Sequence, residues 1–105
     1  MKKIVWTGSS KADLKSFPAA AIDDMGYQLF QVQCGLEPAD WKPMGIVGPG
    51  VREIRVRDAD GIYRTIYLAT RSQAVYVLHC FQKKTQQTSQ RDIELARKRL
   101  QNILR

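Results

Sequence analysis

The sequence predicts a single α+β domain with the element order β-α-α-β-β-β-α, in which an antiparallel sheet carries helices on one face. Three strand-like segments follow one another between residues 51 and 81, and their links are short enough for hairpin turns. Helix-like segments with an apolar stripe stand before and after these strands. The chain has 105 residues, which is the length of one domain, so residues 1–105 are expected to share one core.

A short strand and two helices are predicted at the start of the chain. The strand covers Ile4–Trp6. Ser10 and Asp13 have capping-box spacing and mark a first helix, which Pro18 interrupts. Pro18 is also well placed as the first residue of a second helix. That helix has one apolar stripe with a period of three to four residues, formed by Ile22, Met25, Leu29 and Val32.

The middle of the chain is predicted to be a loop followed by a meander. Leu36–Gly50 contains three prolines and three glycines, which favour a loop. Strands are expected at Val51–Asp58, Ile62–Ala69 and Ala74–Phe81. The last of them is almost continuously apolar, which is typical of a strand covered on both faces.

The last predicted element is a helix that runs to about residue 104. Ser89 and Asp92 again have capping-box spacing at its start. Basic residues cover most of its surface, and its narrow apolar stripe consists of Ile93, Ala96, Leu100 and Ile103.

The charge balance narrows the class of partner. The chain has 17 Lys and Arg residues against 10 Asp and Glu residues, a net charge of +7. Such an excess attracts polyanions, of which nucleic acid is the commonest, although an anionic membrane or an acidic protein would also fit. No apolar run approaches the ~20 residues of a membrane span, and the first residues do not form a signal peptide. We therefore expect a cytoplasmic protein that does not bind to membranes.

The two cysteines do not indicate a metal site or a disulfide. Cys34 and Cys80 lie far apart and lack CxxC spacing, so both are expected to be buried thiols in a reducing compartment. The sequence also lacks an HExxH motif, a phosphate-binding glycine loop and a recognisable Ser/His/Asp set. An enzyme with this sequence would work without a metal or other cofactor, through its cationic side chains.

Basic residues gather on the predicted meander. Arg55 and Arg57 are two positions apart on one strand and therefore share a face. Tyr63, Tyr67 and Tyr76 lie on neighbouring strands, so this sheet face could hold phosphates and stack bases, or it could be an ordinary solvated surface. The residues predicted to bind RNA are Arg52, Arg55, Arg57, Tyr67 and Arg71.

Three further residues near the last strand are candidates for chemistry. Lys83 and Lys84 could lower each other's pKa and stabilise a phosphorane, or they could simply belong to a polar loop. His79 is the only histidine and is expected to share a face with Val75, Val77 and Phe81. It could be a general base or a core residue with satisfied hydrogen bonds.

Four segments together resemble the phage-derived, HigB-like branch of the RelE/ParE toxin superfamily. They contain the elements E-[IL]-R, Y-R-x-x-Y and F-x-K-K-T in this order. The segments are Val51–Arg55, Asp60–Tyr67, Val77–Gln86 and Asp92–Ala96. The likeness covers nearly the whole chain, and it implies the same fold that the periodicity predicts.

The resemblance implies a ribosome-dependent endoribonuclease that cuts translated mRNA by attack of the 2′-hydroxyl on the adjacent phosphate. It implies catalytic roles for Arg64, which matches the active-site arginine, and for Lys83, Lys84 and His79. No tyrosine follows Tyr76, so the family's terminal tyrosine has no counterpart here. The resemblance also implies a helix-turn-helix antitoxin of the HigA type as partner, and the net charge makes an acidic inhibitory segment physically reasonable.

Two alternatives stay open at this point. One is a non-catalytic toxin that poisons DNA gyrase, as the ParE-like branch of the same fold does. The other is an inactive phage-derived module that only binds nucleic acid. The nuclease hypothesis predicts that Arg64→Ala abolishes toxicity and leaves the fold intact. It also requires folding to gather Arg55, Arg64, Lys83 and Lys84 into one cluster on an uncovered side of the sheet.

Overall fold

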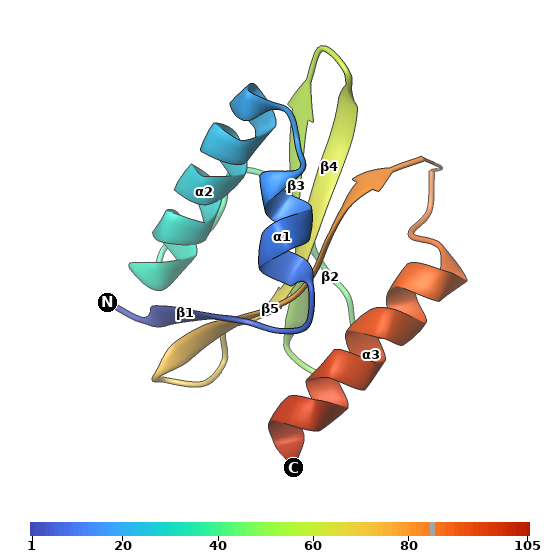
Figure 1. Cartoon of the computed structure of the whole chain (residues 1–105). Coiled ribbons are helices and arrows are strands. Elements are labelled where there is room, and N and C mark those ends of the chain that lie inside the picture. The colour runs from blue at the N-terminus through green and yellow to red at the C-terminus, as the bar shows by residue number, and fades with distance from the viewer. Residues whose placement is uncertain (85) are drawn as a thin grey trace.

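The computed structural model describes residues 1–84 and 86–105 and confirms the α+β class (Figure 1). Thr85, the last residue of the F-x-K-K-T element, lies outside the described residues. All seven predicted elements are present, together with one short additional strand. The elements are β1 (Lys3–Trp6), α1 (Ser10–Lys15), α2 (Ala19–Gln33), β2 (Trp41–Pro43), β3 (Val51–Asp58), β4 (Gly61–Leu68), β5 (Ala74–Lys83) and α3 (Gln90–Leu104).

The five strands form one mixed sheet in the order β1-β5-β4-β3-β2. The predicted meander of β3, β4 and β5 is confirmed, and β2 adds to β3 in an antiparallel manner. However, β1 pairs with β5 in parallel, so the prediction of a purely antiparallel sheet is wrong at this edge. A parallel neighbour requires a long connection, and the pattern of β1 alone does not reveal which strand it will join.

The additional strand β2 lies within the segment predicted as a loop. Trp41 pairs with Ile54 and Pro43 pairs with Arg52. A proline is tolerated here because β2 is an edge strand, where a missing N–H removes no ladder bond on the outer side.

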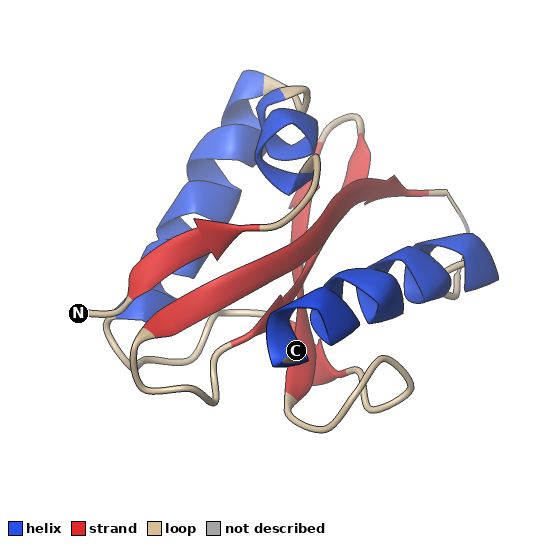
Figure 2. Ribbon diagram, turned by 60° about the horizontal axis from the view of Figure 1, so that its bottom comes forward, coloured by secondary structure: helices blue, strands red, loops and turns tan. Residues whose placement is uncertain are grey.

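Helices cover both faces of the sheet, in contrast to the prediction of one covered face. The helices α1 and α2 pack on one face and α3 packs on the other (Figure 2). Val75 and Val77 contribute to the core under α1 and α2, whereas Ile66 and Leu78 contribute to the core under α3. The interior strands are apolar on both sides for this reason, and no complete sheet face is left open.

A β-bulge in β5 changes the direction of its second half. Tyr67 pairs with Val77 and Ile66 pairs with His79, so Leu78 is one extra residue on β5. Because side chains alternate along a strand, this extra residue turns His79 to the α3 face. His79 therefore does not share a face with Val75 and Val77, as predicted, but lies on the opposite face, stacked on Phe81.

The predicted start of α3 is confirmed. Pro18 is the N-cap of α2 and not its first residue. The capping box predicted for Ser10 and Asp13 is wrong, because the N-cap of α1 is Ser9 and its side chain makes no capping hydrogen bond. The backbone N–H of Asp92 donates to Ser89 Oγ (3.2 Å), which caps α3. Pro18 directly precedes α2, and the N–H of Ile22 donates to its carbonyl. In α1, the N-cap is Ser9, whose hydroxyl donates to the Asp13 carboxylate (2.7 Å).

The cysteines differ in burial. Cys80 is buried under α1 and α2, as predicted, but Cys34 is exposed. Cys34 directly follows α2 as its C-cap, on the turn that Gly35 completes, and this position points away from the core. Among the helices described, none has the length and apolar character needed to cross a membrane.

Candidate functional site

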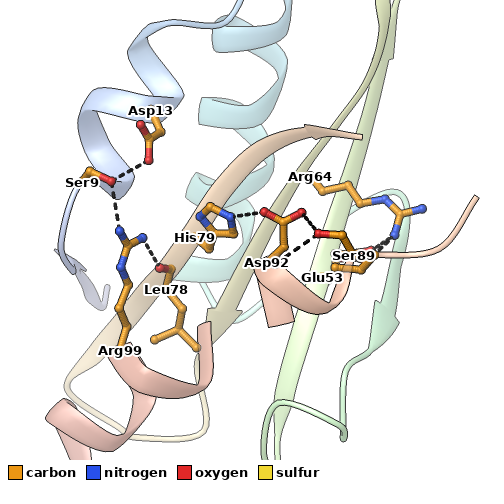
Figure 3. A network of polar contacts seen from close by, with 10 residues as sticks. Ser9, Asp13, Glu53, Arg64, Leu78, His79, Ser89, Asp92 and Arg99 are labelled. Atoms are coloured by element: carbon orange, nitrogen blue, oxygen red, sulfur yellow. Dashed lines mark hydrogen bonds and ion pairs between the residues drawn. The ribbon is translucent and has the colours of Figure 1, made fainter. Parts of the chain in front are cut away.

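The centre of the candidate site is an ion pair on the α3 face of the sheet. Arg64 Nη1 donates to Glu53 Oε1 (2.5 Å), and neither side chain is exposed to solvent (Figure 3). Thr88, in the segment before α3, accepts from Arg64 Nη1 (2.9 Å) and donates to Glu53 Oε2 (2.8 Å). These three residues therefore attach the start of α3 to strands β3 and β4.

Three more cations surround this ion pair. Arg55 is the direct cross-strand partner of Arg64, and Lys42 is the partner of Glu53, with its Nζ 3.9 Å from Oε1. Lys83 lies on β5, on the side of Arg64 opposite to Arg55. The charges of the other cations act on its ammonium group. We call Lys42, Arg55, Arg64 and Lys83 the cationic cluster. It holds four positive charges around one buried carboxylate.

The cationic cluster shifts the pKa values of its own members. Partial burial, followed by the charges of Arg64, Arg55 and Lys42, lowers the pKa of Lys83, while Glu53 opposes this shift. Burial, and to a smaller degree the charge of Arg55, lowers the pKa of Arg64, whereas the charge of Glu53 raises it. A lysine beside three other cations releases its proton more readily than a free lysine. The lowering of the Lys83 pKa was predicted from Lys84, but burial and the charges of the arginines on β3 and β4 and of Lys42 cause it.

Several hydrogen-bond donors in the cationic cluster are unused. Arg64 Nε and Nη2 and Arg55 Nε are buried and form no hydrogen bond with any residue that the structure describes. Buried guanidinium donors without acceptors are costly, and an anion that reached them would satisfy them. The cationic cluster therefore keeps buried donors without hydrogen bonds, although Asp40 Oδ1 lies 3.9 Å from Arg55 Nε.

The other predicted catalytic residues border a hollow of about 530 Å³ beside the cationic cluster. Lys83 and Lys84 line it together with Arg91 from the first turn of α3. Lys84 is exposed and directly follows β5. The predicted grouping of Arg55, Arg64 and Lys83 is therefore present, with Lys84 at its rim, but Arg64 is covered by Thr88 instead of lying on an open face.

His79 lines the same hollow and forms a hydrogen bond with the carboxylate of Asp92. Its Nε2 is 2.6 Å from Asp92 Oδ1, and the hydroxyl of Ser89 donates to Asp92 Oδ2 (2.6 Å), as Figure 3 shows. The ring stacks on Phe81 with 4.8 Å between the ring centroids. His79 Nδ1 is buried and has no hydrogen-bond partner within the described part of the chain. The Asp92 carboxylate therefore fixes the orientation of the imidazole ring through Nε2.

Two of the predicted RNA-binding residues lie on the opposite face of the sheet. Arg52 and Tyr67 alternate with Glu53 and Arg64 along their strands and therefore face α2. Arg52 stacks on Trp41, with 3.9 Å from Cζ to the ring centroid. Tyr67 is only 1% exposed and cannot stack on a base.

Arg55 belongs to the cationic cluster, and the last two predicted RNA-binding residues, Arg57 and Arg71, are exposed at opposite ends of the sheet. Arg57 is on the α3 face near the β3–β4 hairpin, close to Arg55. Arg71 lies in the turn between β4 and β5, at the other end. Tyr63 is buried against Phe17, so it too is unavailable to a base.

The sequence reading missed Glu53, Lys42 and Thr88. Glu53 could have been found, because it lies two positions before Arg55 and must share its face. Lys42 could not, because its segment was predicted as a loop. Groups of three or more His, Cys, Asp or Glu side chains that could hold a metal do not occur among residues 1–84 and 86–105.

Comparison with known proteins identifies the family of this chain. Residues 12–101 match the family described as "Phage derived protein Gp49-like (DUF891)". A comparison with curated proteins finds no match. The matched segment contains the cationic cluster, His79 and most of α3. Because it covers most of the 105 residues, the protein belongs to the phage-derived Gp49-like family, a RelE-like family whose members are commonly toxins of toxin–antitoxin systems.

Proposed function

We propose that this protein is a HigB-like toxin of a type II toxin–antitoxin system that cleaves translated mRNA on the ribosome without a metal. The observation that supports this most directly is the cationic cluster, in which buried donors of Arg64 and Arg55 form no hydrogen bond with any residue that the structure describes. A phosphate of the RNA backbone carries the charge and the oxygens that these donors need.

The proposed reaction is an intramolecular transesterification, in which phosphorus exchanges its bond to the 5′-oxygen for a bond to the 2′-oxygen. The 2′-hydroxyl loses its proton and its oxygen attacks the adjacent phosphorus. The bond from phosphorus to the 5′-oxygen breaks, and that oxygen takes a proton. The products are a 2′,3′-cyclic phosphate and a 5′-hydroxyl. The enzyme must therefore offset charge on the phosphorane, accept one proton and supply another.

The side chains of the site can be assigned to these tasks. Arg55, whose side chain is 28% exposed, offsets the charge of the phosphorane directly, and the covered Arg64 adds its charge from behind Thr88, because positioned cations act most strongly where charge develops. Lys83 has a lowered pKa and accepts the proton of the 2′-hydroxyl. His79, oriented by Asp92, supplies the proton to the 5′-oxygen. Lys84, exposed at the rim, attracts the message.

The binding surface around the site extends along the α3 face. Arg57 and Arg91 are exposed on the two sides of the cationic cluster and can contact further phosphates. We further propose that a helix-turn-helix antitoxin of the HigA type restrains the toxin in the cytoplasm. An acidic segment of that partner would cover the same cations and so block the message.

The test is cleavage of a defined mRNA in a bacterial translation extract, with the 5′ ends mapped. The wild-type protein is expected to cut only when ribosomes translate the message. Lys83→Met is expected to cut at least about 100-fold more slowly, since positioned proton transfer contributes about that much or more. The matched control is Lys15→Met, an exposed lysine on α1 at the other face of the sheet, which is expected to cut at the wild-type rate.

Other outcomes would decide against this function. Wild-type cleavage by Lys83→Met contradicts the proposed site. Growth arrest with intact message and signs of DNA damage indicates a gyrase-directed toxin instead. Salt-sensitive RNA binding without growth arrest or cleavage indicates an inactive nucleic-acid-binding module.

A further inference from the structure

A second pocket lies on the α2 face of the sheet, away from the cationic cluster. It has a volume of about 230 Å³ and lies between the turn after α2 and the strands β3 and β4. Its polar lining comes from Lys2, Glu37, Arg52, Tyr67 and Thr70. We propose that this pocket binds a carboxylate carried by a polypeptide, such as a glutamate side chain or a chain end of a protein partner.

The first observation is a buried hydroxyl with no partner. Tyr67 is 1% exposed, and its hydroxyl forms no hydrogen bond with any residue in the described ranges. The Arg52 guanidinium lies beside it, but a hydrogen bond of normal geometry is absent. Burial raises the pKa of Tyr67, against the effect of Arg52, so the hydroxyl keeps its proton and can donate. A ligand oxygen in the pocket would supply the missing acceptor.

The second observation is that the chain itself already places a carboxylate here. Glu37 accepts from Arg52 Nη1 through both oxygens, at 3.1 Å and 2.9 Å. Both side chains are partly exposed, 61% for Glu37 and 38% for Arg52, so this pair contributes little stability. Trp41 holds the guanidinium in place by stacking. An incoming carboxylate can therefore replace Glu37 on a guanidinium that is already oriented.

The lining of the pocket favours an organic carboxylate over an inorganic anion such as phosphate. Val32, Leu36 and Ala69 form apolar walls next to the charged groups. Such walls gain from contact with the aliphatic stem of an amino acid, which free phosphate lacks. The volume suits one side chain or one chain end and is too small for a nucleotide. The chemistry therefore fits a peptide segment and does not fit RNA.

The pocket is tested by NMR titration of the full chain, following backbone amide shifts. The probes are acetyl-Ala-Glu-Ala-amide, acetyl-Ala-Ala-Ala with a free carboxyl end, the neutral acetyl-Ala-Gln-Ala-amide, and sodium phosphate. At least one of the two charged peptides is expected to shift the amides of Gly35, Glu37 and Tyr67. The responding peptide then identifies the source of the carboxylate. The neutral peptide and phosphate are expected to leave these amides unchanged at the same concentration.

Two variants make the test specific. Tyr67→Phe removes only the hydroxyl and is expected to weaken binding about tenfold, the usual effect of one hydrogen bond to a charged group. Glu37→Gln removes the competing carboxylate and is expected to tighten binding severalfold. Lys11→Met, an exposed lysine on α1, is the control and is expected to bind like the wild type. Unchanged affinity in Tyr67→Phe, equal shifts with the neutral peptide or phosphate, or no shift with either charged peptide would overturn the proposal.

Discussion

Arg64 and Glu53 pair inside the protein with 2.5 Å between Nη1 and Oε1, and each side chain is 0% exposed. The pair joins β3 to β4, and Thr88 extends it to the segment before α3. The residue with the strongest catalytic resemblance is therefore also part of the structure that holds the α3 face together.

This burial changes what can be expected of Arg64→Ala. The variant leaves the Glu53 carboxylate buried without its 2.5 Å partner, while Lys42 stays 3.9 Å away and Thr88 still donates to it. Removal of one partner of a buried ion pair costs about 3–5 kcal/mol of the free energy of unfolding. We expect that loss in urea unfolding, so the sequence-based prediction of an intact fold is replaced. The double variant Arg64→Met, Glu53→Leu is expected to recover most of the loss, and an unchanged unfolding midpoint for Arg64→Ala would contradict the burial argument.

A second prediction concerns the histidine and its acid. His79→Gln is expected to lower the rate of message cleavage by about 100-fold or more, because it removes a positioned proton donor. Asp92→Asn is expected to act in the same direction through the orientation of the ring. The measurement is the cleavage rate as a function of pH, with unfolding followed in parallel. Gln90→Ala, an exposed neighbour in the first turn of α3, serves as control. Wild-type rates in His79→Gln would assign this residue to packing alone.

A third prediction concerns the salt dependence of RNA binding. Arg57 and Lys84 are exposed beside the cationic cluster and are expected to contact phosphates. Each substitution by Met should reduce the slope of log affinity against log salt by about 0.7 for single-stranded RNA. The assay is fluorescence anisotropy with an RNA that lacks the attacking 2′-hydroxyl. Lys15→Met should keep the wild-type slope, and equal slopes in all of these proteins would show that this face does not bind the RNA backbone.

A fourth prediction concerns stability at high pH. Burial raises the pKa of the Cys80 thiol to about 12 from 9.0, against a smaller effect of the Thr65 hydroxyl. Above pH 9 the thiol ionises in the unfolded chain but not in the folded one. Its stabilising contribution is therefore complete below pH 9 and is lost as the pH rises toward 12, at about 1.4 kcal/mol per pH unit.

Urea unfolding between pH 8 and pH 11 can isolate this contribution. Cys80→Val keeps an apolar side chain of similar size and removes the ionisable group. The variant is expected to lose less stability per pH unit than the wild type. Parallel pH profiles for the two proteins would show that the thiol does not contribute.

Local pattern was sufficient to predict every helix and strand that the structure describes except the short edge strand β2. The serine and acid at capping spacing placed the start of α3, and the apolar stripe of Ile93, Ala96 and Leu100 is buried as predicted. The strand β3 has the predicted bounds. Alternation also placed Arg55 and Arg57 on one face. These features depend on interactions between residues close in sequence, so the sequence reveals them directly.

The arrangement of the candidate site was decided by the pairing of strands that are far apart in the sequence. The extra residue Leu78 in β5 turned His79 to the α3 face, and no residue near it in sequence signals that step. The same pairing brought Glu53 and Lys42 to the arginines and placed α3 on the face that was expected to stay open. Sequence by itself determined the class of fold, all elements except β2, and the excess of positive charge. Only the tertiary structure decided which charges meet and which are covered, because a side chain's surroundings in a sheet depend on which strand lies beside it and in what register.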